Sequence, residues 1–224
     1  MIVASSAPTR IGLFGGGTDV GEYAQKYGGI CLNFAINIRQ NFTLDTDNQV
    51  QSWLSEDSLD FINNLINPYK VGDIGIRHEF EGEIESGLGS SAAAAVALVG
   101  AVDKIKGLCL SRSEIAEKAW DIEVNKVGLF GGKQDQYCSS YGGVNVMEFG
   151  KEVKVTPLLS TSYLYKVLPC LSLFYIGNNR KSPKIQEGLR NITTEQKENL
   201  DKIKIIAFEA INNIEDPEKI GRLL

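Results

Sequence analysis

The chain has 224 residues, of which 43% are hydrophobic and 23% charged, enough to bury one large domain or one domain and part of a second. Its formal net charge of −5 excludes a protein that holds nucleic acid mainly by charge. No apolar run reaches the roughly 18 residues of a membrane span, and the N-terminus lacks an export signal. We therefore expect a cytoplasmic protein with neither a membrane nor a nucleic-acid partner.

The four cysteines are scattered along the chain, and there is a single histidine, His78. No Cys-x-x-Cys pair exists, so a Cys/His zinc cluster is excluded and a reducing compartment is favoured. Because no neighbour in the sequence would orient its ring, we interpret His78 as packed or solvated rather than catalytic.

The first 44 residues predict β-structure. Residues 1–14 are interpreted as two short strands separated by a turn at Ala7-Pro8-Thr9. Apolar residues alternate from Gly28 to Leu44, which predicts a strand with one buried face, a bend near Gln40-Asn41, and Asn33 pointing outward.

Between these strands lies a glycine run that ends in a carboxylate, Gly15-Gly16-Gly17-Thr18-Asp19. Each glycine in an ordered element costs roughly 0.5–1 kcal/mol relative to alanine, so the run indicates that something approaches the backbone closely. A flexible turn is the alternative interpretation, but it does not account for Arg10 and Asp19 on either side of the run.

A second glycine-rich loop follows a helix predicted over residues 56–69 and a strand within 71–83. It reads Gly87-Leu88-Gly89-Ser90-Ser91 and opens a helix of alanine and aliphatic residues that ends at Gly107. The free N–H groups and dipole of such a helix bind phosphate well. One serine could cap the helix and the other reach a phosphate-bound metal. A tight turn with a serine cap stays open as the alternative.

The next helix places a carboxylate where the core should be. Ser111 and Glu114 form a predicted capping box, and Glu123 falls on the apolar stripe with Ala116 and Ala119. A buried carboxylate must be paired, hydrogen-bonded or bound to metal. A structural ion pair is therefore one interpretation of Glu123, and a metal ligand is the other.

A third glycine-rich turn delivers another carboxylate, because Gly131-Gly132 is followed by Lys133, Gln134 and Asp135. Asp135 comes 12 residues after Glu123, so both can converge on one cleft, one holding a metal and the other accepting a proton.

The last part of the chain predicts fewer elements. A hairpin is expected from residues 141–149 and 153–155, a strand over 167–176, and an amphipathic helix over 195–214. We place a domain boundary near residue 160, giving domains 1–160 and 161–224. One strand and one helix cannot close a core, so we interpret the chain as a fragment or as one that packs against another copy, such as a homodimer.

The three motifs, in this order, resemble those of the GHMP kinases, and their wording is most similar to bacterial D-glycero-D-manno-heptose 7-phosphate kinases. The resemblance covers essentially the whole chain. It implies an α+β, two-layer fold, with a ribosomal-protein-S5-domain-2-like N-terminal domain and part of a ferredoxin-like C-terminal domain. It also implies an ATP-dependent sugar kinase, acting on the anomeric hydroxyl of the heptose phosphate.

The resemblance also implies roles for individual residues. Asp135 would be the catalytic base, with Arg10 stabilising developing charge. Mg²⁺ would be held by Ser91 and Glu123. The ATP phosphates would lie on a loop made of Gly87, Leu88, Gly89, Ser90, Ser91 and Ala92. The sugar would be bound by Gly16, Gly17, Thr18, Asp19, Lys133 and Gln134. Such chemistry asks mainly for positioning and charge neutralisation.

The chain also departs from the pattern, which leaves alternatives open. Gly16 and Gly17 stand where galactokinases have acidic and histidine residues, and the third, C-terminal glycine motif of the family is not found. A non-catalytic binding module for nucleotides or sugar phosphates is therefore one alternative. A kinase for another sugar, such as galactose or fucose, is the other. For a phosphorylated sugar, the candidate cations are Lys133, Arg39, Arg180 and Lys181.

Overall fold

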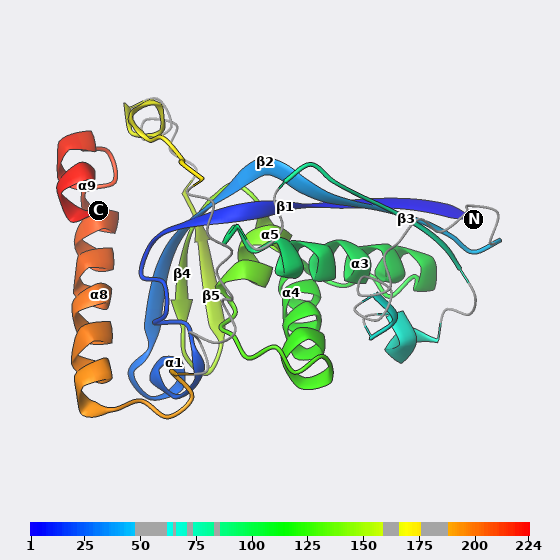
Figure 1. The fold of residues 1–224 in the computed structure, drawn as a ribbon, viewed down its shortest axis with the longest axis horizontal. Helices are drawn as coiled ribbons and strands as arrows, with labels where there is room; N and C mark the ends of the chain where they lie inside the picture. The colour runs from blue at the N-terminus through cyan, green and yellow to red at the C-terminus, as the bar shows by residue number, and fades with distance from the viewer. Residues whose placement is uncertain (48–61, 65, 71–73, 83–85, 159–165, 176–187) are drawn as a thin grey trace.

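The computed structural model describes most of the chain as an antiparallel sheet covered by helices (Figure 1). Five strands form the sheet: β1 (Ile2–Phe14), β2 (Gly29–Asp45), β3 (Gly75–Phe80), β4 (Val144–Phe149) and β5 (Val153–Pro157). The order is β1-β2-β4-β5, and β3 pairs with the far end of β2. The described residues are 1–47, 62–64, 66–70, 74–82, 86–158, 166–175 and 188–224.

Helices cover the sheet on both faces, which makes the fold α+β. One face carries α3 (Ser90–Lys106), α4 (Arg112–Asp121) and α5 (Gln134–Tyr141), whereas α8 (Thr194–Asn212) and α9 (Pro217–Leu223) stand against the other (Figure 1). The short helix α1 (Gly21–Tyr27) follows β1. No helix among the described residues is long and apolar enough to cross a membrane.

Strand β2 is the spine of the sheet, because it pairs with three other strands. In its first half Ile30 and Leu32 face α8 and α9, while Cys31 lies in the core formed with α4 and α5. Asn33 is fully buried, so its predicted outward position is wrong. Its side chain donates to Met147 Sδ at 3.7 Å, inside the sheet–helix layer.

The turn predicted at Ala7-Pro8-Thr9 is wrong, because β1 is one continuous strand. Instead the pairing of β1 with β2 shifts register between Pro8 and Arg10, a β-bulge. At this irregularity the Thr9 hydroxyl donates to the backbone carbonyl of Ile38, Ile38 O, at 2.8 Å. On β2 the same irregularity falls between Ala35 and Arg39, earlier than the bend predicted near Gln40-Asn41.

This bulge changes which side chains of β1 face the helices. Before it, odd-numbered residues such as Val3 and Ala7 pack in the α3 core. After it, the even-numbered Arg10 reaches α5, where it contacts Asp135. Side chains alternate along a regular strand, so the switch accompanies the break in regular pairing between Pro8 and Arg10. The bulge therefore aims Arg10 at α5.

The predicted helices over residues 90–106 and 195–214 are confirmed as α3 and α8, and Gly107 ends α3 in the left-handed conformation. The Ser111–Glu114 capping box is also confirmed. Within the predicted 56–69 helix, residues 56–61 and 65 lie outside the described residues. Residues 62–64 and 66 are helical, as predicted, and Asn67–Tyr69 form a short 3₁₀ turn, η1.

Two strand predictions fail in the second half of the chain. Tyr141 is the last residue of α5 rather than part of the β4–β5 hairpin. The predicted strand over 167–176 is a 3₁₀ turn, η3 (Leu168–Cys170), followed by residues 171–175 outside any strand. Pro169 lacks the N–H that a strand ladder needs, which favours the turn.

Candidate functional site

The loop before α3 lies directly on β1. Arg10 N donates to Leu88 O at 2.9 Å and Arg10 Nη1 donates to Gly87 O at 3.0 Å. Gly89 is the N-cap of α3 in the left-handed conformation, with φ of 69° and no side-chain cap. The prediction of a serine cap is therefore wrong. The loop presents the first N–H groups of a buried helix, the kind of position that binds anions.

Ser91 instead contacts Glu123, which lies in a π-helical turn, η2 (Ile122–Lys126), that continues α4. Ser91 Oγ donates to Glu123 Oε1 at 2.5 Å, and Gln136 Nε2 donates to Glu123 Oε2 at 2.7 Å. The carboxylate is 5% exposed, and burial raises its pKa to about 7. In the described part of the chain no lysine or arginine pairs with it, so the structural ion pair considered for Glu123 is not found there.

Asp135 projects from the first turn of α5 toward the same loop. Its Oδ1 lies 2.7 Å from Arg10 Nε, and its Oδ2 lies 3.2 Å from the position that a Cβ on Gly89 would take. Its side chain keeps 22% of its exposure, so the ion pair does not seal it from ligands. The charge of Asp135 also acts to raise the pKa of Asp19 and of Glu123.

Asp19 is the third carboxylate and is held by Gln134. Its Oδ2 accepts from Gln134 N at 3.1 Å, and its Oδ1 accepts from Gln134 Nε2 at 3.1 Å. Burial raises its pKa to about 6. A Cβ on Gly132 would lie 1.9 Å from Asp19 Oδ2, so only glycine lets this turn pass so close to the carboxylate.

Several predicted sugar-binding side chains are already engaged inside the protein. The Thr18 hydroxyl is buried and donates to Gly15 O at 2.8 Å. Lys133 Nζ contacts both oxygens of Glu117, at 2.7 and 2.8 Å. Gln134 Nε2 donates to Asp19 Oδ1. Thr18 and Lys133 thus stabilise the loops around Asp19, and the Lys133 side chain keeps 26% of its exposure.

The residues fit a magnesium ion that is shared with phosphates. Mg²⁺ prefers oxygen ligands and is usually bound by one or two carboxylates, with water and phosphate oxygens completing the shell. Ser91 and Glu123 supply a hydroxyl and a carboxylate side by side. Among the described residues no group of three or more His, Cys, Asp and Glu side chains could hold a metal without such help.

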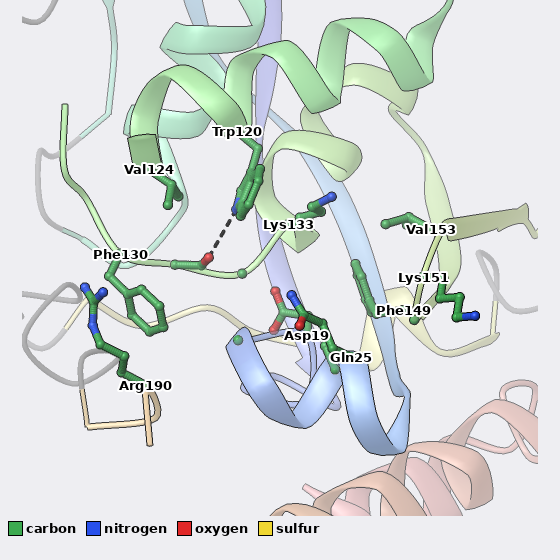
Figure 2. Close-up of a pocket in the computed structure, with 15 residues that line it drawn as sticks. Asp19, Gln25, Trp120, Val124, Phe130, Lys133, Phe149, Lys151, Val153 and Arg190 are labelled. Atoms are coloured by element: carbon green, nitrogen blue, oxygen red, sulfur yellow. Dashed lines mark hydrogen bonds between the residues drawn. The ribbon is translucent and has the colours of Figure 1, made fainter. Parts of the chain in front are cut away.

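A cavity of about 610 Å³ opens beside Asp19 (Figure 2). Figure 2 shows Trp120 and Phe130 on its walls, with Trp120 Nε1 donating to Gly131 O at 3.1 Å. Arg190 also lines it, its guanidinium 4.4 Å from the centre of the Phe130 ring. The cavity therefore combines aromatic walls, a cation and a buried carboxylate, which suits a polar ligand.

Of the cations predicted for a sugar phosphate, Lys133 lines the cavity. Arg39 donates to Ser6 Oγ at 2.7 Å and does not line the cavity. Arg180 and Lys181 lie outside the described residues. Lys151 and Arg190 do line the cavity, and no sequence signal marks them, because an isolated surface cation has no pattern. Arg190 lies at the cavity wall through its cation–π contact with Phe130, a residue far from it in the sequence.

Comparison with known proteins places the chain in context. Residues 59–143 match the GHMP kinases N terminal domain. The D-glycero-alpha-D-manno-heptose 7-phosphate kinase of Campylobacter jejuni is 28% identical over 93% of this chain and 69% of that protein. A mevalonate kinase of Methanothermobacter thermautotrophicus is 30% identical, over 67% of this chain and 52% of that protein.

The fold was also compared with solved structures. The crystal structure of a D-glycero-D-manno-heptose 1-phosphate kinase from Bacteriodes thetaiotaomicron matches with a TM-score of 0.79 and 26% identity. The match covers 100% of this chain and 77% of that chain. These three relatives are all kinases of small molecules.

Proposed function

Given that this chain contains a GHMP kinase N-terminal domain, we propose that it is an ATP-dependent kinase that phosphorylates a hydroxyl group of a small sugar. The observation that carries this proposal is the first turn of α5. It holds Asp135 beside Arg10, at the mouth of the glycine loop, while the residues on either side contact Asp19 and Glu123. Phosphoryl transfer needs this combination of an anion site, a metal site and one accessible carboxylate.

The nucleotide phosphates would lie over the loop from Gly87 to Ala92. Backbone N–H groups at the start of α3 would donate to phosphate oxygens, and Gly89 lets the backbone approach closely. Ser91 and Glu123 would hold Mg²⁺, which neutralises phosphate charge when bound. This arrangement explains why a carboxylate is buried without a lysine or arginine partner among the described residues.

Asp135 would take the proton of the attacking hydroxyl. Its Oδ1 is held by Arg10, which leaves Oδ2, at Gly89, to face the acceptor. The guanidinium contacts this carboxylate and would stabilise negative charge on the hydroxyl oxygen or the γ-phosphate. Asp19 and the backbone of Gly16 and Gly17 would bind other hydroxyls of the sugar.

We propose a heptose phosphate as the acceptor, phosphorylated at its anomeric hydroxyl. Two observations support this choice. Both heptose kinases among the relatives span most of this chain. The cavity beside Asp19 is also lined by Lys151 and Arg190, which could bind an acceptor's own phosphate.

The substitution Asp135→Asn tests the proposal. It keeps the side-chain shape but removes the base, so turnover should fall by about 10²–10⁴-fold. Nucleotide affinity should change by less than about twofold, because Asp135 is not among the groups proposed to bind ATP. The measurement is phosphate transfer to heptose 7-phosphate, together with nucleotide titration calorimetry.

Asp121→Asn is the matched control, since Asp121 is exposed and the same charge is removed. Turnover by Asp135→Asn at the rate of this control would exclude Asp135 as the base. Wild-type chain that binds ATP but phosphorylates neither the heptose phosphate, galactose nor fucose would instead identify a non-catalytic binding module.

A further inference from the structure

The residues on either side of Asp135 are both buried glutamines, and each one contacts a different carboxylate. We infer that Gln136 positions Glu123 for the metal and that Gln134 positions Asp19 for the acceptor. They are positioning residues, because they act through the carboxylates rather than on the ligands. The inference rests on the proposed function, and it assigns separate tasks to two neighbours of the catalytic base.

Helix geometry makes this division of tasks feasible. Successive side chains leave an α-helix about 100° apart, so three consecutive residues reach three different neighbours. Gln134 points to the glycine run after β1, Asp135 to Arg10 on β1, and Gln136 to Glu123 in η2. One turn of α5 thereby fixes groups from three separate parts of the chain relative to each other.

Gln136 fixes Glu123 from the side opposite to Ser91. Ser91 holds Oε1 and Gln136 holds Oε2, so the carboxylate plane cannot rotate without losing one bond. The amide is a neutral donor, and it leaves the negative charge of Glu123 available for a cation. A lysine at this position would neutralise that charge and compete with the metal.

Gln134 holds Asp19 with two donors, its backbone N–H and its side-chain amide, one on each oxygen. This two-point contact orients the carboxylate at the wall of the cavity. Removing the side-chain amide would leave Asp19 Oδ1 with the weaker contact from Gly17 N, at 3.3 Å. Asp19 could then rotate about its remaining bond to Gln134 N.

In each glutamine amide, the nitrogen has a carboxylate partner and the oxygen has no partner among the described residues. Gln134 Oε1 and Gln136 Oε1 are buried and accept no hydrogen bond from any residue that the structure describes. Burying an amide oxygen without a donor is unfavourable, so a purely structural position would favour an apolar side chain. The unfavourable burial of each amide oxygen is therefore offset by the hydrogen bond from the amide nitrogen to a carboxylate.

The test compares Gln136→Met and Gln134→Met, which keep the volume of the side chain and remove the donor. For Gln136→Met, the Mg²⁺ concentration that gives half-maximal rate should rise by roughly 10- to 100-fold, the effect of losing a bond to a charged group. The KM for heptose 7-phosphate should change little. For Gln134→Met the pattern should reverse, with a raised acceptor KM and an unchanged Mg²⁺ dependence.

Ser139→Ala is the control, because Ser139 is buried on the same helix and its hydroxyl contacts none of the site carboxylates. Both kinetic parameters should stay at the wild-type value in this variant. Alanine replacements of both glutamines give a second pair should a methionine variant not fold. The inference is overturned when the two glutamine variants shift the same parameter, or when neither differs from Ser139→Ala.

A readout without turnover separates this inference from the proposed function. Calorimetric titration of ATP with and without Mg²⁺ should show that Gln136→Met weakens binding only when the metal is present. Wild-type protein without phosphate transfer to any sugar would overturn the proposed function, while this titration would still report on Gln136. Equal Mg²⁺-dependent affinity in wild type and Gln136→Met would overturn the inference.

Discussion

Asp19 keeps a carboxyl group in a part of the protein that water hardly reaches. Its side chain is 4% exposed, and burial raises its pKa from 3.8 to about 6. The folded state therefore favours the protonated form more than the unfolded state does. The stability that comes from this preference is complete below about pH 4 and is lost as the pH rises through about 6. At neutral pH the ionised Asp19 destabilises the fold.

We predict that Asp19→Asn is more stable than wild type at pH 7.5, by on the order of 2–3 kcal/mol, since each pKa unit corresponds to about 1.4 kcal/mol. The new amide can be satisfied, because Gln134 Oε1 is unpartnered among the described residues and can accept from it after the Gln134 amide rotates. Urea unfolding at pH 4, 5, 6 and 7.5 measures the difference.

The stability gain of Asp19→Asn should disappear below about pH 4, where wild-type Asp19 is protonated as well. Acceptor binding should weaken at every pH, since an amide replaces the carboxylate. A gain that stays constant from pH 4 to 7.5 would contradict a shifted pKa as its cause. Asp121→Asn, at an exposed position, is the matched control.

At the scale of elements, α3 begins and ends on a glycine in the left-handed conformation. Gly89 has φ of 69° and Gly107 has φ of 63°. A side chain in this conformation costs about 1–2 kcal/mol at either end. The two sites differ in their surroundings, because a Cβ on Gly107 would meet nothing within 4 Å, whereas one on Gly89 would lie 3.2 Å from Asp135 Oδ2.

Substitutions at these two positions distinguish the effect of backbone strain from the effect of displacing Asp135. We predict that Gly89→Ala and Gly107→Ala lower the free energy of unfolding by similar amounts, about 1–2 kcal/mol. Only Gly89→Ala should also lower kcat, since its methyl group presses on the carboxylate proposed to accept the proton. Thermal unfolding and steady-state kinetics check both parts. Equal kcat in the two variants would show that the loop tolerates the added methyl group.

The sequence predicted the elements that have a strong local pattern. Alanine-rich α3, the capping box of α4 and the apolar face of α8 depend on neighbours in the chain, and all three were predicted. The bulge at Thr9 has no local signature, because it depends on how β1 pairs with β2. The apolar run after Val167 was predicted as a strand, since composition alone does not show that no partner strand pairs with it in the structure.

In the candidate site, too, the residues with a local sequence signal were predicted and those that depend on distant contacts were not. Arg10, Asp19, Glu123 and Asp135 stand out because charged residues beside glycines or on an apolar stripe are unusual. Sequence reasoning missed the task proposed for Gln136 and the places of Lys151 and Arg190, because these depend on contacts between distant segments. It also expected one of Ser90 and Ser91 to cap α3, whereas no side chain caps this helix.

At the scale of the whole molecule, α8 packs on the face of the sheet opposite to α3. Ala207 and Ala210 let the helix lie close to the sheet, next to Leu32 and Phe34. The N-terminal half of α8 also supports the glycine run after β1, since a Cβ on Gly17 would lie 3.5 Å from Leu200 Cδ2. The division into domains 1–160 and 161–224 stays a prediction, and this shared core favours joint unfolding.

We predict that Leu200→Ala lowers the free energy of unfolding by about 2–5 kcal/mol, because it leaves a cavity between α8 and the glycine run. Ile205→Ala, on the same helix but 65% exposed, should change it by less than about 0.5 kcal/mol. Urea unfolding followed by circular dichroism and by tryptophan fluorescence should give coincident transitions. Separate transitions would show that α8 unfolds on its own.

The position of α8 and α9 has a consequence for how the protein is made. A ribosome releases β1 and β2 early, but the helices that cover Phe14, Ile30 and Leu32 come from residues 194–223. During most of translation this apolar face of the sheet is therefore not yet buried by α8 and α9. Apolar surface exposed in this way promotes aggregation of an incomplete chain.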